Sequence, residues 1–84
     1  MIVGPISGQE FIWSIVEAAR SYHLEVASDR KFYRVIRDIY LEDNRYIFDL
    51  LPPGSYYWRV SSVSALGLEG RFSPISYFIY PDSD

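Results

Sequence analysis

The stretch Leu51-Pro52-Pro53-Gly54-Ser55-Tyr56-Tyr57-Trp58-Arg59-Val60 decides what kind of fold this chain adopts. Its two prolines hold φ near about −65°, and the glycine permits a positive φ that other residues resist. Residues 56–60 are mostly aromatic or β-branched, which favours a pleated strand. The sequence therefore predicts a strand that leaves directly from a rigid corner.

Further strands are predicted on both sides of this stretch. Tyr22, Leu24 and Val26 alternate with His23, Glu25 and Ala27, the two-residue period of a half-buried strand. Residues 46–48 and 72–80 are rich in the same aromatic and β-branched residue types. Pro74 lies near the beginning of the last segment, where a missing N–H is tolerated on an edge strand.

Two segments are ambiguous. Within residues 32–40 the apolar side chains recur at i, i+3, i+4 and i+7, which is typical of an amphipathic helix. The same segment is rich in β-branched and aromatic residues, which lose side-chain freedom in a helix, so we favour a strand. Residues 10–20 fit either one helix or a strand over 11–13 followed by a turn, and composition alone does not choose.

Composition excludes several classes of protein. With 84 residues, no cysteine and a formal charge of −3, the chain predicts one small domain over residues 1–84 without disulfides. Residues 1–8 and 81–84 read as linkers, because they hold glycine, proline and polar residues. The eight Lys and Arg residues are scattered, so we expect no nucleic-acid partner. No apolar run is long enough for a membrane span or a signal peptide.

No motif predicts catalysis, a cofactor or a metal ion. His23 is the single histidine, and alternation directs it away from the core, so we expect a solvent-facing residue rather than a general base or metal ligand. Glu25 and Asp38 could form a carboxylate pair for glycoside hydrolysis, but the sequence does not determine their separation. Residues 42–44 gather oxygen ligands without the spacing of a calcium loop, and predict a polar turn.

Three parts of the chain together carry a family resemblance. They are Trp13-Ser14 with residues 17–26, the stretch 51–60, and Gly67-Leu68-Glu69-Gly70-Arg71-Phe72-Ser73. Together they resemble a fibronectin type III domain, in particular the modules of bacterial envelope proteins with FecR or LysM domains. The resemblance implies an all-β, seven-stranded antiparallel immunoglobulin-like sandwich in two sheets. It also implies that both ambiguous segments are strands.

The resemblance also implies a core and a corner. The expected inward-facing side chains are Trp13, Tyr22, Leu24, Val26, Tyr56, Trp58 and Val60. Tyr56 matches the tyrosine corner of the family, in which a buried ring sends its hydroxyl to a backbone group of the preceding corner.

The predicted core leaves several aromatic residues and an arginine unused. After the inward positions are filled, alternation leaves Tyr57 and Arg59 on the outer face, with His23 and Tyr77 on neighbouring strands. Such residues are enriched at interface centres and can stack on sugars. They are therefore the candidate partner surface, although we favour ordinary cross-strand pairing on an exposed sheet as the explanation of these residues.

These inferences lead to a functional expectation. We expect a non-catalytic structural or interaction module, without cofactor, that spaces or positions neighbouring domains of a larger bacterial envelope protein. An odd strand count would place its two ends at opposite poles. The alternatives are a protein- or glycan-binding module and an accessory domain of a secreted hydrolase. We expect a monomer in isolation, located in the periplasm or cell envelope by resemblance alone.

Overall fold

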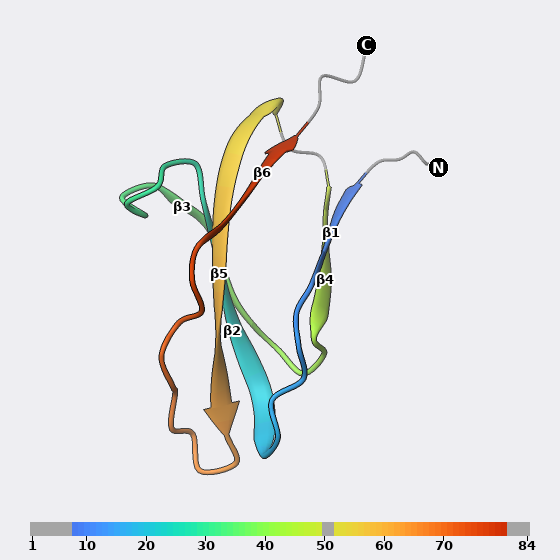
Figure 1. Ribbon diagram of the computed structural model, residues 1–84, viewed down its shortest axis with the longest axis vertical. Coiled ribbons are helices and arrows are strands. Elements are labelled where there is room, and N and C mark those ends of the chain that lie inside the picture. Colours follow the sequence, from blue (N-terminus) through green and yellow to red (C-terminus); the bar gives the residue numbers. More distant parts are fainter. Residues whose placement is uncertain (1–7, 50–51, 81–84) are drawn as a thin grey trace.

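The computed structural model describes residues 8–49 and 52–80, and within them the chain forms six strands and no helix (Figure 1). The strands are β1 (Gly8–Ile12), β2 (Ala19–Ala27), β3 (Val35–Leu41), β4 (Arg45–Asp49), β5 (Gly54–Ser64) and β6 (Ser76–Tyr80). The described part contains no helix that could cross a membrane. The expected linkers 1–7 and 81–84, like Leu51 of the deciding stretch, lie outside the described residues, whereas Gly8 already belongs to β1.

All strand pairs are antiparallel and they form two sheets. One sheet has the order β3-β2-β5-β6 and the other pairs β1 with β4. Figure 1 shows β1 and β4 as a layer beside the larger sheet, so the chain crosses between layers after β1, β3 and β4. The helix alternatives over residues 10–20 and 32–40 are wrong, because both segments contain strands. The last strand is shorter than predicted and begins after Pro74.

Alternation along β2 and β5 determines the core. Leu24 and Val26 are fully buried and pair with Val60 and Trp58, respectively. Cross-strand neighbours on one face pack directly against each other, and the predicted burial of Tyr22, Leu24, Val26, Tyr56 and Val60 is confirmed.

The contact between the two sheets is centred on a residue outside the expected core set. Phe11 of β1 is 2% exposed, stacks on Trp58 with ring centroids 4.8 Å apart, and meets Phe78 edge to face at 4.9 Å. Trp58 and Trp13 are only partly buried, and Trp13 lies just beyond the end of β1 rather than on a strand. Phe11 lies at the centre of the contact because its side chain on β1 faces the larger sheet and packs between Trp58 and Phe78.

The corner before β5 forms as predicted. The Tyr56 hydroxyl donates a hydrogen bond of 2.6 Å to the Pro52 carbonyl, and Gly54 has a φ of 154°. Tyr56 itself is buried. The hydroxyl therefore ties the start of β5 to the connection that crosses from the other sheet.

Replacing Tyr56 with phenylalanine removes this hydrogen bond and leaves the Pro52 carbonyl without it. We expect the free energy of unfolding to fall by about 1–2 kcal/mol, the cost of one lost, part-buried hydrogen bond. Denaturant titration of the variant measures the loss. Tyr77→Phe is the control, because Tyr77 is exposed, and we expect it to stay within about 0.5 kcal/mol of wild type. Equal stability of the two variants would contradict the role of the corner.

The described ends of the chain lie at one pole, not two. Gly8 at the start of β1 pairs with Asp49, and Tyr80 at the end of β6 pairs with Gly54. Asp49 and Gly54 flank the short β4–β5 connection, so both ends lie beside it, as Figure 1 shows. The expectation of opposite poles is wrong for these residues, because an even number of strands returns the chain to the end where it began.

The turn between β2 and β3 is organised by one carboxylate. Asp29 accepts hydrogen bonds from the backbone N–H groups of Arg34, Tyr33 and Lys31 at 2.8, 3.1 and 3.2 Å. The hydrogen bond from Arg34, joined by those from the other two N–H groups, lowers the pKa of Asp29 below its ordinary value. This turn presents the Phe32 side chain, whose backbone adopts a left-handed φ of 59°.

The lowered pKa of Asp29 predicts a pH-dependent contribution to stability. A carboxyl group whose folded pKa is depressed stabilises the fold above its unfolded pKa, and this stabilisation is lost as pH falls through the folded value. We therefore expect wild type to be more stable than Asp29→Ala at neutral pH, and the difference to shrink as pH falls below about 4. Urea unfolding at several pH values measures the difference. A difference that stays constant down to about pH 2 would contradict the assignment.

Candidate functional site

The four residues predicted as a partner surface share one face of the four-stranded sheet. His23 pairs with Ser61, and Ser61 follows Arg59 and Tyr57 at two-residue spacing on β5, while Tyr57 pairs with Tyr77 on β6. Their side chains alternate with the core residues, so they point away from β1 and β4. The structure nevertheless divides them into a covered centre and an exposed side.

His23 is part of the covered centre, so the expectation that it faces solvent is wrong. The residue is 8% exposed. Its ring stacks on Tyr40 of β3 with centroids 4.3 Å apart and planes 10° from parallel, and Phe72 covers it from the β5–β6 connection at 5.2 Å. Alternation placed the side chain on the outer face correctly, but two aromatic rings from other segments exclude water from it.

Both ring nitrogens of His23 face carboxylates. Nδ1 lies 2.6 Å from Glu69 Oε2, and Nε2 lies 2.5 Å from Asp38 Oδ1. Glu69 is itself held in place, because it accepts hydrogen bonds from the Ser61 hydroxyl at 2.7 Å and from the Tyr40 hydroxyl at 3.2 Å. Only an imidazolium ring donates from both nitrogens at once, so this geometry fits the protonated form of His23.

The pKa shifts agree with this geometry. Burial lowers the pKa of His23, but the hydrogen bonds and charges of Glu69 and Asp38 raise it by more, so the pKa lies above the ordinary value of 6.5. The hydrogen bonds from His23 and Ser61 hold the pKa of Glu69 below its usual range. The ring and its carboxylates therefore stabilise each other's charged forms.

Arg59 is held by an ion pair and by two aromatic rings. Its Nε and Nη2 donate to Glu25 Oε1 at 2.8 and 2.7 Å. Its guanidinium carbon lies 4.1 Å from the ring centroid of Phe32 and 4.4 Å from that of Phe72. A guanidinium that stacks on two rings and pairs with one carboxylate has few groups left for a partner. Arg59 therefore belongs to the covered centre with His23.

The exposed side is an aromatic groove. Tyr57 and Tyr77 lie side by side with ring centroids 5.3 Å apart, and Tyr77 is 56% exposed. With Arg30 and Ile75 they line a surface hollow of about 640 Å³. We call these four residues the tyrosine groove. Of the predicted partner surface, only Tyr57 and Tyr77 remain available for contact.

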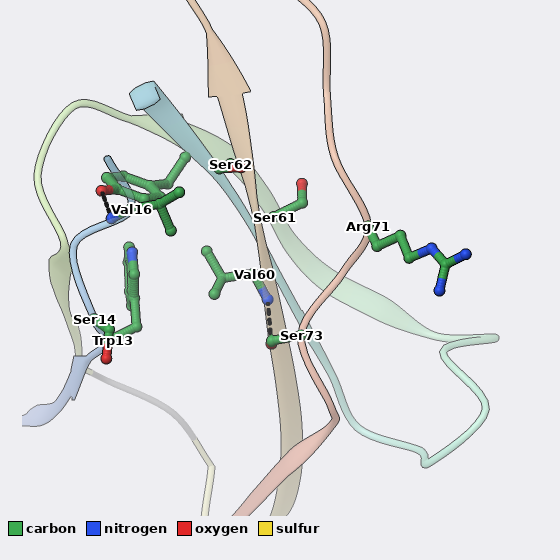
Figure 2. A pocket seen from close by; sticks show the side chains of 9 residues that line it. Trp13, Ser14, Val16, Val60, Ser61, Ser62, Arg71 and Ser73 are labelled. Atoms are coloured by element: carbon green, nitrogen blue, oxygen red, sulfur yellow. Dashed lines mark hydrogen bonds between the residues drawn. The ribbon is translucent and has the colours of Figure 1, made fainter. Parts of the chain in front are cut away.

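A second hollow, of about 310 Å³, is lined by Trp13 and Val16 of the β1–β2 connection and by Val60 of β5 (Figure 2). The Trp13 indole Nε1 is buried and contacts no hydrogen-bond acceptor within residues 8–49 and 52–80, while its ring meets Tyr22 edge to face at 5.7 Å. Other polar groups here bond to each other, as in the hydrogen bond from Val60 N to Ser73 Oγ. Figure 2 shows the Arg71 side chain directed away from Trp13. Of the buried polar side-chain atoms in the described residues, the Trp13 N–H is the one without a partner.

The carboxylate pair considered for glycoside hydrolysis is now placed. Glu25 and Asp38 are directly opposite each other on β2 and β3. The nearest ligand atoms of His23, Glu25 and Asp38 all lie within 4.8 Å of one another. Glycosidase carboxylates are about 5–9.5 Å apart, with the sugar between them. Here the histidine ring takes that place, so the pair has no room for a sugar.

Sequence reasoning missed Glu69, Phe72 and Phe32 as partners of the outer face. Glu69 is 46 positions from His23 along the chain, and both phenylalanines lie in connections between strands. Phe32 appeared only as part of an apolar stripe. Periodicity in the sequence does not predict which residues of a connection fold back and cover a sheet.

Comparison with known proteins adds no family assignment. No family model, curated protein or solved structure matches this chain. Function is therefore inferred from the residues and their geometry.

Proposed function

We propose that this chain is a fibronectin type III-like module that acts as a non-catalytic interaction domain. The observation that carries the proposal is the Tyr56 corner, whose hydroxyl bonds to the Pro52 carbonyl where the chain crosses between sheets. The layer pattern supports it, because β1 and β4 form one sheet while β3, β2, β5 and β6 form the other. A tyrosine corner at such a crossing is a hallmark of immunoglobulin-like sandwiches.

The proposed role is to position neighbouring domains of a larger bacterial envelope protein, outside the cytoplasm. This setting follows from the resemblance to modules of envelope proteins with FecR or LysM domains. Because Gly8 and Tyr80 lie at the same pole, the module fits a side-by-side arrangement of its neighbours better than a linear rod. The proposal is therefore a positioning domain that contacts its neighbours rather than a passive spacer.

The tyrosine groove is the contact surface in this proposal. Tyr57 and Tyr77 are held at a fixed distance by paired strands, so little side-chain entropy is lost when a partner covers them. The exposed Tyr77 and the half-buried Tyr57, beside Arg30, are residue types that carry binding energy at protein interfaces. The covered centre, by contrast, makes its polar contacts within the module.

Backbone amide shifts of the labelled domain test this role. We expect a neighbouring domain of the parent protein to perturb residues around Tyr57 and Tyr77, and the double variant Tyr57→Ser/Tyr77→Ser to weaken that contact at least about tenfold. Ile47→Ser is the matched control, because it removes an exposed apolar side chain from the other sheet. Absence of any localised perturbation would favour a passive spacer and contradict the proposal.

The same titration with a chitin trisaccharide distinguishes the glycan-binding alternative. Planar tyrosine rings also stack on sugars, so both ligands would use Tyr57 and Tyr77. Saturable shifts with the trisaccharide and none with the neighbouring domain would assign the groove to glycan and overturn the proposed protein contact.

A further inference from the structure

Three potential metal ligands, His23, Glu25 and Asp38, meet on two neighbouring strands at the edge of the covered centre. His23 Nε2 lies 2.5 Å from Asp38 Oδ1 and 3.9 Å from Glu25 Oε2. Glu25 and Asp38 face each other across the β2–β3 pair, and His23 is two residues from Glu25 on the same face. The three ligand atoms converge because antiparallel pairing places them together, not because a flexible loop happens to fold over them.

The Glu25 side chain has one carboxylate oxygen that its contact with Arg59 does not use. It is only 14% exposed, and both of its contacts to Arg59 use Oε1. Within the described residues, Oε2 receives no hydrogen bond and is aimed at His23 Nε2. One imidazole N–H cannot serve both Asp38 and Glu25. A cation between the three groups would satisfy all of them.

The surroundings of His23 Nδ1 resemble those of histidines that bind metal ions through the other ring nitrogen. Metal-ligating histidines almost always donate the other ring N–H to a carboxylate, which fixes ring orientation and raises ligand basicity. Here Glu69 takes that role at Nδ1, and Ser61 and Tyr40 orient Glu69 in turn. The Tyr40 and Phe72 rings prevent His23 from rotating away.

We propose that His23 Nε2, Asp38 and Glu25 form a binding site for one divalent transition-metal ion of the zinc class, with Glu69 as the hydrogen-bond partner of His23 Nδ1. One imidazole with two carboxylates suits such ions, whereas calcium and magnesium prefer oxygen ligands alone. The bound ion clamps the edge strand β3 to β2. This site is independent of the tyrosine groove.

The distances require only small movements. Zinc bonds of about 2.0–2.2 Å separate tetrahedral ligands by about 3.4 Å. Relative to His23 Nε2, Asp38 Oδ1 therefore withdraws by about 1 Å and Glu25 Oε2 approaches by about 0.5 Å. The carboxylate oxygens of Asp38 and Glu25, within 4.8 Å of each other, approach by up to about 1.4 Å. Asp38 has room to do so, because its side chain is 56% exposed on an edge strand. The same exposure leaves the remaining coordination position open to water.

Charge also favours a divalent ion. Three carboxylates, those of Glu25, Asp38 and Glu69, face one imidazolium and the Arg59 guanidinium, so one negative charge is in excess. A divalent ion on a neutral ring removes that excess. The Arg59 contact to Glu25 Oε1 persists, because the ion uses the other oxygen.

The test uses the chelator-treated chain of residues 1–84 and Zn²⁺ alone as the probe. We expect saturable one-to-one binding by calorimetry, a midpoint of thermal unfolding that rises with Zn²⁺ concentration, and a change in the ¹⁵N shift of His23 Nε2 on coordination. With Asp38→Asn we expect affinity to fall by about 100-fold or more, and with Glu69→Gln by about 10–100-fold. Glu42→Gln is the matched control, an exposed carboxylate outside the cluster, and keeps wild-type affinity.

Three results would each overturn the site. They are no binding by wild type, equal affinities of Asp38→Asn and Glu42→Gln, and Zn²⁺ binding that leaves the His23 ring signals unchanged. Because the ring signals are measured on wild type, a poorly folded variant does not remove the test.

Discussion

Replacing Trp58 with alanine is expected to cost about 3–5 kcal/mol and to leave the chain largely unfolded at about 37 °C. The indole stacks on Phe11 at 4.8 Å with planes 8° apart, and lies 6.0 Å from Trp13. Phe11 comes from the small sheet and Trp58 from the large one, so the substitution removes one of the two ring contacts of Phe11 across the sheets and leaves the one with Phe78. A domain of this size has a total stability of about 5–15 kcal/mol, so the loss is a large share of it.

Denaturant titration with tryptophan fluorescence and circular dichroism measures this loss. Tyr77→Ala is the matched control, because it truncates an exposed aromatic side chain on the same sheet. We expect that control to change stability by less than about 1 kcal/mol. A cooperative, near-wild-type melt of Trp58→Ala would show that the sheets do not depend on the Phe11–Trp58 stack.

Replacing Arg59 with alanine is expected to lower the free energy of unfolding by about 2–4 kcal/mol. The change leaves the Glu25 carboxylate, 14% exposed, without its ion pair. It also removes the cation that Phe32 and Phe72 cover from two sides. The lower end of the range reflects the partial exposure of Arg59, which weakens the ion pair through solvent screening.

Two companion variants separate the causes. Arg59→Lys keeps the positive charge but loses the planar fork, so we expect it to recover only part of the stability. The double variant Glu25→Gln/Arg59→Ala removes the unpaired charge, and we expect it to be more stable than Arg59→Ala alone. If Arg59→Ala proved as stable as wild type, Arg59 would be available to a partner and would return to the candidate contact surface.

Alternation predicted the inward residues well where it was strict. Tyr22, Leu24 and Val26 on β2 lie where the period of two placed them, because a strand presents successive side chains to opposite faces. For residues 32–40 the strand prediction is confirmed over the later part, Val35 to Tyr40, whereas the earlier part belongs to the turn that presents Phe32. An apolar stripe drawn across a turn and a strand imitates a helix.

The candidate sites were predicted less completely. Tyr57 and Tyr77 were predicted together and lie side by side, Tyr77 exposed and Tyr57 half-buried. His23 and Arg59 were placed on the correct face but with the wrong environment, because their cover comes from Phe72, Phe32 and Glu69 in distant connections. Pairing of β2 with β3 was equally hidden, although it alone brings Asp38 to His23.

The sequence by itself determined the local structure: strands where aromatic and β-branched residues alternate, and a corner at Pro52-Pro53-Gly54 closed by Tyr56. These features depend on backbone preferences and on neighbours a few residues apart. Only the tertiary structure decided the burial of His23, the pairing of Glu25 with Arg59 and the return of both described ends to one pole. Those depend on which strands pair and where connections cross the sheet, and such long-range contacts leave no periodic signal in the chain.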